Sequence, residues 1–161
     1  MNYQFNTIIH QLKDKEKKEI FEKLNEQFGI SKIEGALFRI GAERIRLFTG
    51  ELTEKELNAF LEHIRIEGIG VSILKEERGE IRLSIEGVQI LGSQATKNIF
   101  QLRDEQLESW MHGEDIQQKN EQKGFVIMKY KDDFLGSGKL SAEKISNFVP
   151  KPRRLIRKES K

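Results

Sequence analysis

The chain has no cysteine, and only two of its 161 residues are proline. Without thiols it can form neither a disulfide nor a thiolate metal site, which excludes a secreted disulfide scaffold and favours a reducing compartment. No stretch approaches the roughly 20 apolar residues that a membrane span needs. The first 12 residues also lack the basic and apolar regions of a signal peptide. We therefore expect a cytoplasmic protein that does not bind a membrane.

Signals for catalysis and metal binding are also missing. His10, His63 and His112 stand far apart, and none has a second histidine or a carboxylate at metal-ligand spacing. The "GSGK" segment is not a phosphate-binding loop, because Leu140 replaces the hydroxyl residue and Asp133 replaces the first glycine. No strand precedes a glycine-rich dinucleotide turn, and no nucleophile can be paired with a base. We predict a protein without enzymatic activity, cofactor or metal ion.

The apolar residues that are present fall in patterned clusters. Hydrophobic residues make up 37% of the chain and charged residues 34%, which is polar but sufficient for a core. The length admits one ample domain or two small ones. No internal repeat or coiled-coil heptad competes with an organisation in two units.

Positive charge is concentrated at one end of the sequence. The formal net charge is only +2, but the segment from Lys144 to Lys161 holds seven basic residues and a single acid, Glu159. This segment therefore carries +6 and the remainder −4. Such an asymmetry points to a polyanionic partner, the alternative being a solvated basic tail.

Two helices are predicted in the first half of the chain. A stripe of Ile20, Phe21, Leu24 and Phe28 predicts an amphipathic helix over residues 13–28, which Gly29 ends. Thr53 stands three residues before a glutamate, the spacing of a capping box, and predicts a second helix. The buried stripe expected for this second helix consists of Leu57, Phe60, Leu61 and Ile64.

Four strands are predicted around these helices. The runs "GALFRIG" and "ERIRLFTG" alternate as adjacent strands that turn near Gly41. The segment "GIGVSILKEERGEIRLSIEGVQIL" predicts two more strands, with a turn at Glu77 to Gly79 and with Ile81, Leu83 and Ile85 on one face of the second. Residues 1–95 are thus expected to form a small α/β unit.

The second half is expected to be mainly β. "NIFQL" predicts a strand, Asp104 is the expected N-cap of a short helix, and Gly113 ends that helix. "GFVIMKY" and "DFLGSGKL" predict a hairpin across "KDD", and "KISNFVPKPRRLI" supplies a further strand. Trp110 is expected in the core beside its helix neighbours, the alternative being a stacking platform for an unpaired base. We predict an α+β fold with a second unit over residues 96–161.

Three segments of the second half resemble the PUA domain, a small RNA-binding pseudo-barrel: "DEQLESWMHGEDI", "KGFVIMKYKDDFLGSGK" and "NFVPKPRRLI". They are most similar to the PUA-like domain that follows the catalytic domain in some Sun-family RNA cytosine methyltransferases, where L-G-x-G-K and N-x-x-P-K-x-x-R recur. The matching positions are Gly124, Leu135, Gly136, Gly138, Lys139, Asn147, Pro150, Lys151 and Arg154. In the first unit, "FRIGAERIRLFTG" and "IRLSIEGVQIL" resemble the pre-PUA domain of two-domain ribosome-biogenesis factors.

The resemblance implies RNA binding in a groove between the helix, the loop after it and the last strand. An ordered run of arginine and lysine can dock RNA backbone, because arginine offers a planar fork of donors and lysine a mobile charge. Pro150 and Pro152 restrict the backbone that leads into this run. The expected RNA-binding residues are Gly113, Lys139, Lys151, Arg153, Arg154 and Arg157.

Three functions remain open at this point. The first is a non-catalytic RNA-binding accessory protein in rRNA or tRNA modification and ribosome biogenesis, with a structured RNA as its partner. The second is an adaptor that docks on an RNA methyltransferase or a ribosomal protein and contacts RNA only weakly. The third is an enzyme whose cleft the sequence cannot reveal. We predict the first, because the basic segment coincides with the resemblance.

Overall fold

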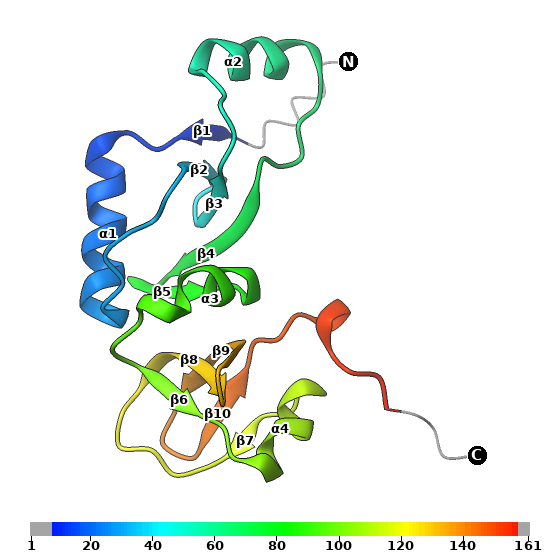
Figure 1. Cartoon of the computed structure of the whole chain (residues 1–161). Coiled ribbons are helices and arrows are strands. Elements are labelled where there is room, and N and C mark those ends of the chain that lie inside the picture. The colour runs from blue at the N-terminus through cyan, green and yellow to red at the C-terminus, as the bar shows by residue number, and fades with distance from the viewer. Residues whose placement is uncertain (1–7, 158–161) are drawn as a thin grey trace.

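The computed structural model describes residues 8–157 and shows an α+β fold, as expected (Figure 1). This part of the chain holds two five-stranded sheets, with strand orders β1-β2-β3-β4-β5 and β6-β8-β9-β10-β7. Lys158 and Lys161 of the basic segment lie outside the described residues. Within residues 8–157 no helix combines the length and apolarity of a membrane span. The cytoplasmic location stays a prediction.

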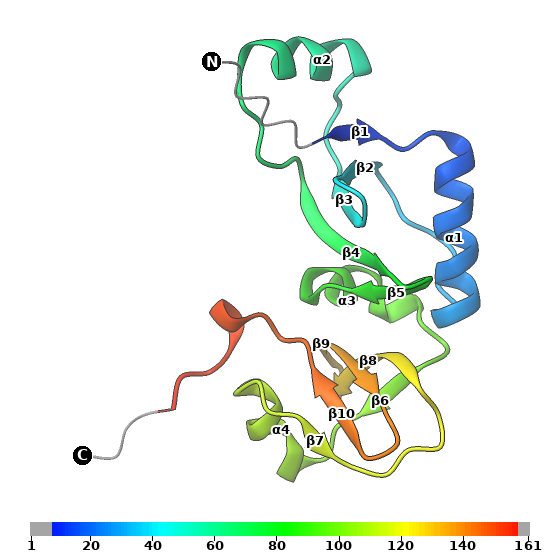
Figure 2. The ribbon, with the colours of Figure 1, turned by 180° about the vertical axis from the view of Figure 1, so that it is seen from behind.

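The first sheet is antiparallel throughout and carries helix α1 (Asp14–Phe28) on one face. Ile45, Leu74 and Leu83 lie side by side across three strands and are buried in the cluster that includes Ile20 and Leu24 of α1. Figures 1 and 2 show α1 along one side of this sheet. The strands are β1 (Ile9–Gln11), β2 (Ala36–Ile40), β3 (Arg44–Phe48), β4 (Val71–Glu77) and β5 (Glu80–Leu83).

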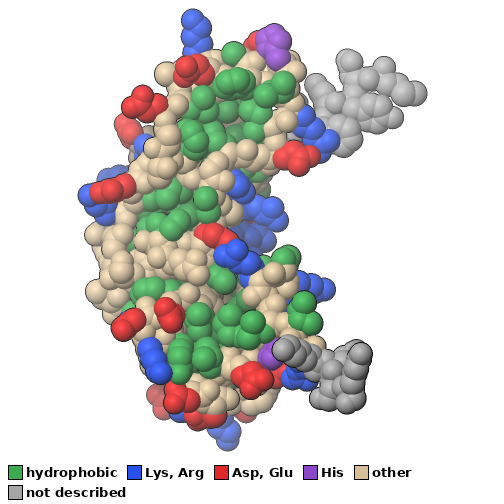
Figure 3. Space-filling view, turned by 45° about the vertical axis from the view of Figure 1, so that its right-hand side comes forward, with side chains coloured by type: hydrophobic (Ala, Val, Ile, Leu, Met, Phe, Trp, Pro, Cys, Tyr) green, Lys and Arg blue, Asp and Glu red, His purple; other side chains and the backbone are tan. Residues whose placement is uncertain are grey.

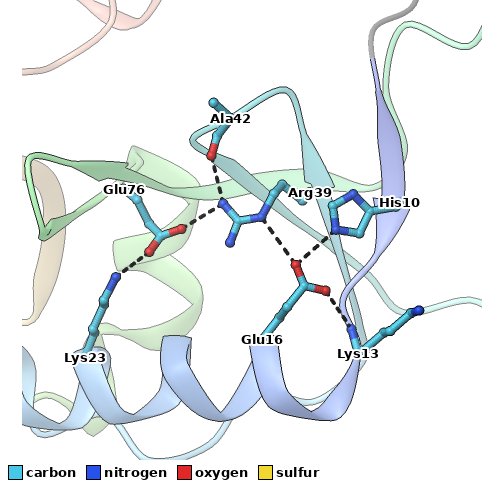
Figure 4. Close-up of polar contacts among 7 residues, drawn as sticks. All are labelled: His10, Lys13, Glu16, Lys23, Arg39, Ala42 and Glu76. Atoms are coloured by element: carbon cyan, nitrogen blue, oxygen red, sulfur yellow. Dashed lines mark hydrogen bonds and ion pairs between the residues drawn. The ribbon is translucent and has the colours of Figure 1, made fainter.

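A network of charged groups fastens α1 to the sheet (Figure 4). Glu76 of β4 accepts hydrogen bonds from Lys23 Nζ at 2.7 Å and from Arg39 Nη1 at 2.8 Å. The same Arg39 nitrogen donates to the carbonyl of Ala42, and Arg39 Nε lies 3.8 Å from Glu16. Burial raises the pKa of Glu76, but the two cationic donors outweigh it and hold the pKa below its usual value. The carboxylate is therefore a charged link between α1, β2 and β4.

Helix α2 (Glu54–His63) begins as predicted but is less buried than its apolar stripe suggested. Thr53 Oγ1 accepts from the Glu56 N–H, and the Glu56 carboxylate accepts from the Thr53 N–H, which completes the capping box. Leu57 is buried, whereas Phe60 is 48% exposed and Ile64 56% exposed. The expectation of a fully buried stripe was wrong, because α2 lies at one end of the molecule and contacts only a small satellite cluster (Figure 1).

The strand expected through Ile85 ends at Leu83, and helix α3 (Ile85–Leu91) follows. Ser84 caps this helix, since its hydroxyl accepts from the Gly87 N–H at 2.8 Å. Glycine at position 87 lets α3 approach the sheet, because a Cβ there would lie 1.9 Å from the carbonyl oxygen of Ile73. The extended-strand prediction was wrong because the apolar residues of this segment also fit a helical spacing.

The second sheet is a curled sheet in which β6 is parallel to β8 and the other pairs are antiparallel. The predicted hairpin between β8 and β9 is confirmed, with Lys131 at a φ of 51° in the turn. A short 3-10 helix, η1 (Gly92–Gln94), leads from α3 toward this sheet. The strands are β6 (Ile99–Gln101), β7 (Ile116–Gln117), β8 (Gly124–Tyr130), β9 (Asp133–Leu140) and β10 (Lys144–Asn147).

Helix α4 (Asp104–Met111) packs on this sheet through Trp110. The N-cap of α4 is Arg103, so the prediction of Asp104 was wrong by one residue. The Asp104 carboxylate instead accepts a hydrogen bond from Tyr130 Oη at 3.0 Å. Trp110 is fully buried and donates through Nε1 to the carbonyl of Leu135 at 2.9 Å. Its expected place in the core is confirmed, and it offers no stacking surface.

The two sheets share a hydrophobic core. Phe125 and Ile127 of β8 belong to the same buried cluster as Leu83 and Val88 of the first unit. In addition, the buried Ser137 hydroxyl donates to the carbonyl of Leu83 at 2.7 Å. The chain passes from one sheet to the other between β5 and β6, and the division into units 1–95 and 96–161 stays a prediction.

We predict that Glu76→Gln lowers the free energy of unfolding at pH 7 by about 1–3 kcal/mol, because Lys23 and Arg39 lose their shared charged acceptor. Because the folded-state pKa is below the usual 4.5, this stabilisation is complete above pH 4.5 and is lost as the pH falls through the folded pKa. Denaturant unfolding at a series of pH values from 7 to 3 measures this. The difference in the free energy of unfolding between wild type and variant should become smaller as the pH falls.

The matched control is Glu34→Gln, which removes the charge of an exposed carboxylate paired with Lys32. An exposed pair of this kind contributes little to stability, so the control should unfold like the wild type. A difference between the Glu76 variant and wild type that is independent of pH would contradict the assigned role.

Candidate nucleic-acid interface

The end of α4 and the segment after β10 are joined by the side chain of Asn147. Its Nδ2 donates to the carbonyls of Trp110 at 2.8 Å and Glu114 at 3.2 Å, and its Oδ1 accepts from the Val149 N–H at 2.8 Å. One amide side chain thus satisfies backbone groups on both sides. It fixes the direction in which the basic segment leaves the sheet.

Asp115 supports the same junction from the loop after α4. Its carboxylate accepts from Lys144 Nζ at 2.6 Å and from the backbone N–H of Asn147 at 2.9 Å. The Lys144 ammonium and then the Asn147 N–H hold the pKa of Asp115 below its usual value. The carboxylate is therefore ionised at neutral pH and binds both donors.

The basic residues lie on a tight turn rather than on the expected strand. Lys151–Arg153 form a 3-10 helix, η2, which follows Pro150 and contains Pro152. A proline cannot donate a hydrogen bond to a sheet ladder, and its fixed φ suits a turn, so the strand ends at Asn147. The prediction of an ordered basic strand was wrong in this respect.

Gly113 and Arg154 meet at the end of α4. Gly113 has a φ of +86°, and a Cβ built there would lie 2.3 Å from Arg154 Nε. Arg154 Nε donates to the Val149 carbonyl at 2.9 Å. The Leu155 N–H also donates to the Met111 carbonyl at 2.8 Å. Arg154 therefore holds the turn together and packs over Gly113, while the Leu155 N–H attaches the segment to α4.

The other predicted cations differ in how they are held. Arg153 Nη2 lies 3.1 Å from Glu86 of α3, which ties the turn to the first unit, and Arg157 forms an ion pair with Glu114. Lys151 is exposed and has no ion-pair partner among residues 8–157. Three exposed or half-exposed cations thus surround the turn.

Lys139 is placed apart from this group. Its ammonium lies 3.4 Å from Glu80 of β5 and 4.4 Å from the centre of the Phe125 ring. Within the described part of the chain these are its contacts, at the junction of the two sheets. The structure therefore gathers Gly113, Lys151, Arg153, Arg154 and Arg157 around one turn and does not bring Lys139 to them.

An open depression lies beside the turn, against the last part of α4. It has a volume of about 680 Å³. Leu155 is 55% exposed and Ile156 91% exposed at its edge. His112 Nδ1 lies 2.8 Å from the Leu155 carbonyl, which can only accept, so this nitrogen donates and fixes the edge. The lining residues are Glu108, Ser109, His112, Leu155, Ile156 and Arg157.

The residues that position this surface give little local signal in the sequence. Asn147 was recognised only as part of a motif, and Asp115 and Glu86 carried no signal. Asn147 holds groups on the α4 loop and Glu86 pairs with a residue far along the chain, so both contacts depend on the tertiary fold. An asparagine at the end of a strand and before a proline-rich run is the one local hint.

We predict that Gly113→Ala detaches the turn from α4, because the new methyl group would occupy the place of Arg154. Hydrogen exchange at the Leu155 amide should accelerate strongly in the variant. The control is Gly79→Ala, which has a similar φ of +84° but no neighbour within 4 Å of the new Cβ. Both variants should lose about 1–3 kcal/mol of stability to backbone strain. Equal exchange rates at the Leu155 amide in the two variants would contradict a role of the Gly113–Arg154 contact in attaching the turn to α4.

Comparison with known proteins covers this half of the chain and, in one alignment, nearly the whole chain. Residues 97–155 match the family model described as the methyltransferase RsmF PUA domain. The chain is 24% identical over 156 residues to the ribosomal RNA small subunit methyltransferase F of Vibrio cholerae serotype O1, an alignment that covers 96% of this chain and 31% of that protein.

Two further relatives carry the same name. The protein of Photobacterium profundum is 30% identical over 102 residues, and that of Vibrio vulnificus is 27% identical over 101 residues. Each alignment covers 63% of this chain and 21% of the relative. The chain thus spans about a third of the V. cholerae relative and less of the others. The resemblance of the first unit to a pre-PUA domain stays a prediction. Residues 97–155 are a PUA-like domain that resembles the C-terminal domain of Sun-family RNA methyltransferases.

Proposed function

We propose that this chain binds ribosomal RNA and assists its modification without catalysing the reaction. The observation that carries the proposal is the basic turn over Lys151, Arg153 and Arg154, which is fixed on a PUA-like domain by Asn147 and Gly113. The named relatives are ribosomal RNA methyltransferases, which supports ribosomal RNA as the class of ligand. Transfer RNA, a methyltransferase partner and a ribosomal protein partner remain predictions.

The turn is suited to exchange its internal partners for phosphate. The ion pairs of Arg153 with Glu86 and of Arg157 with Glu114 are open to solvent on at least one side, and such pairs contribute little to stability. A phosphate can therefore replace the carboxylates at small cost. Because the backbone of the turn is already ordered, less conformational entropy is lost on binding than in a flexible tail.

The depression beside the turn supplies a surface for the nucleoside. Leu155 and Ile156 present exposed apolar side chains, and Ser109 and Arg157 add hydrogen-bonding groups at its rim. Aliphatic side chains offer an unpaired base van der Waals contact, while cations beside them hold the backbone. We assign the backbone contact to Lys151, Arg153 and Arg157, with Arg154 and Gly113 as positioning residues.

The test is RNA binding by Lys151→Ala/Arg153→Ala across a salt series, with a fluorescent structured fragment of small-subunit ribosomal RNA. For each phosphate contact that the variant lacks, one counterion fewer is released when the RNA binds. The slope of log affinity against log salt should therefore become shallower by about 2. The matched control is Lys15→Ala/Lys18→Ala, which removes two exposed cations from α1. Both variants should show the circular dichroism of the wild type.

A second candidate is the adaptor, and one observation favours it. Phe60 of α2 is 48% exposed, and Ile64, the extended residue directly after α2, is 56% exposed, so two large apolar side chains lie in solvent at this end of the molecule. If wild type, control and turn variant all bind the RNA equally weakly, the RNA-binding function is refuted. Binding of a ribosomal protein or methyltransferase that Phe60→Ser/Ile64→Ser abolishes would then establish the adaptor.

A further inference from the structure

We propose that RNA bound at the C-terminal turn continues onto the first sheet, where a second row of cations holds its phosphate backbone. This inference rests on the proposed function and extends it to a surface outside the PUA-like domain. The row consists of Arg44 on β3, Lys75 on β4 and Arg82 on β5, with Arg46 beside it.

The register of the sheet places these cations on one face. Arg44 is directly opposite Lys75, and Lys75 is directly opposite Arg82. The neighbouring row of Ile45, Leu74 and Leu83 is buried on the α1 side. Because successive residues of a strand point to opposite faces, the row of cations faces away from α1.

Like charges directly opposite each other destabilise a sheet, so this arrangement has a cost. Acids offset part of it: Glu43 lies 2.9 Å from Lys75 Nζ, and Glu77 lies 3.2 Å from Arg82 Nε. Arg44 is exposed and has no ion-pair partner in residues 8–157. Positive charge remains on this face, and phosphates would stabilise it further.

Arg46 widens the surface at its far end. Its guanidinium donates to the carbonyls of Ile69 at 2.8 Å and Gly70 at 2.5 Å. These bonds use two of the five guanidinium N–H groups, and the side chain is only partly buried. Because both acceptors are neutral carbonyls, the guanidinium charge is not compensated by these bonds, and it lies on the same face as Arg44.

Two contacts connect this face with the C-terminal turn. The Arg82 guanidinium lies 4.7 Å from the centre of the Phe148 ring, which precedes the proline-rich turn. Arg153 of the turn pairs with Glu86 at the start of α3, directly after β5. The row of cations therefore ends where the basic turn begins, and one strand of RNA can contact both.

The shape of the molecule supports a continuous track. Figure 3 shows a hollow between the part built on the first sheet and the C-terminal part, and Lys and Arg side chains gather in it. In Figure 1 this side of the first sheet is the one opposite α1. Neighbouring strands are about 4.8 Å apart, so the cations form a narrow stripe suited to a chain of phosphates.

The test compares Arg44→Gln/Lys75→Gln with the turn variant Lys151→Ala/Arg153→Ala on two RNAs. One is an unstructured RNA of about 6 nucleotides, within the site size of one small domain, and the other is the structured ribosomal fragment. Glutamine keeps the side-chain stem of the residue it replaces. The single variant Arg44→Gln changes only an exposed residue without an ion pair in residues 8–157, so it should fold like the wild type. The control is Lys15→Gln/Lys18→Gln on the opposite side of the sheet.

We expect the sheet variant to bind the structured RNA with a salt slope shallower by about 1 to 2 and to bind the short RNA like the wild type. Arg44→Gln alone should account for about half of the change. The turn variant should weaken binding of both RNAs. If the turn variant is impaired but the sheet variants bind like the control, the extension is refuted and the proposed function stands. If neither is impaired, both are refuted.

Discussion

The packing of the first unit against strands β8 and β9 holds both halves of the chain in one arrangement. Phe125 and Ile127 enter the core that α1 and the first sheet build, and the Ser137 hydroxyl is bound to the Leu83 carbonyl within it. A shared core of this kind resists rotation of one unit on the other. It therefore keeps the cations of the first sheet and the C-terminal turn in a fixed relation, which two domains on a flexible linker would lack.

The second requirement is that the basic turn itself be rigid. Asn147 and the Leu155 N–H attach it to α4, and Arg153 attaches it to α3. Arg154 closes the segment on itself through its bond to the Val149 carbonyl. Charge in a disordered tail attracts polyanions without orientation, whereas charge on a fixed turn sets the path of a bound chain. The order of this segment converts an uneven charge distribution into a candidate binding surface.

Much of the fold could be predicted from local patterns. The capping box at Thr53, the β8–β9 hairpin and the burial of Trp110 follow from spacing within a few residues. The segment after Leu83 could not be assigned in this way, because its apolar residues suit a strand and a helix equally until the Ser84 cap decides. Similarly, the exposure of Phe60 depends on where α2 lies in the molecule, which its own stripe does not encode.

The candidate site was predictable in part for the same reason. Charge and the resemblance pointed to residues 151–157, and the structure gathers them around one turn. The row of cations on the first sheet could not be predicted from the sequence, because only the pairing of three strands aligns Arg44, Lys75 and Arg82. Strand register, unlike spacing along the chain, is a property of the folded sheet.

RNA binding along both surfaces can be measured through the backbone amide NMR shifts of the intact, isotope-labelled protein as it is titrated with the structured ribosomal RNA fragment. We predict shifts at residues 150–157 and on the β3–β4–β5 face that carries Arg44 and Lys75, with α1 unchanged. Shifts confined to α1 or α2, or no shifts with the RNA in large excess over the protein, would contradict RNA binding at the C-terminal turn and on the first sheet.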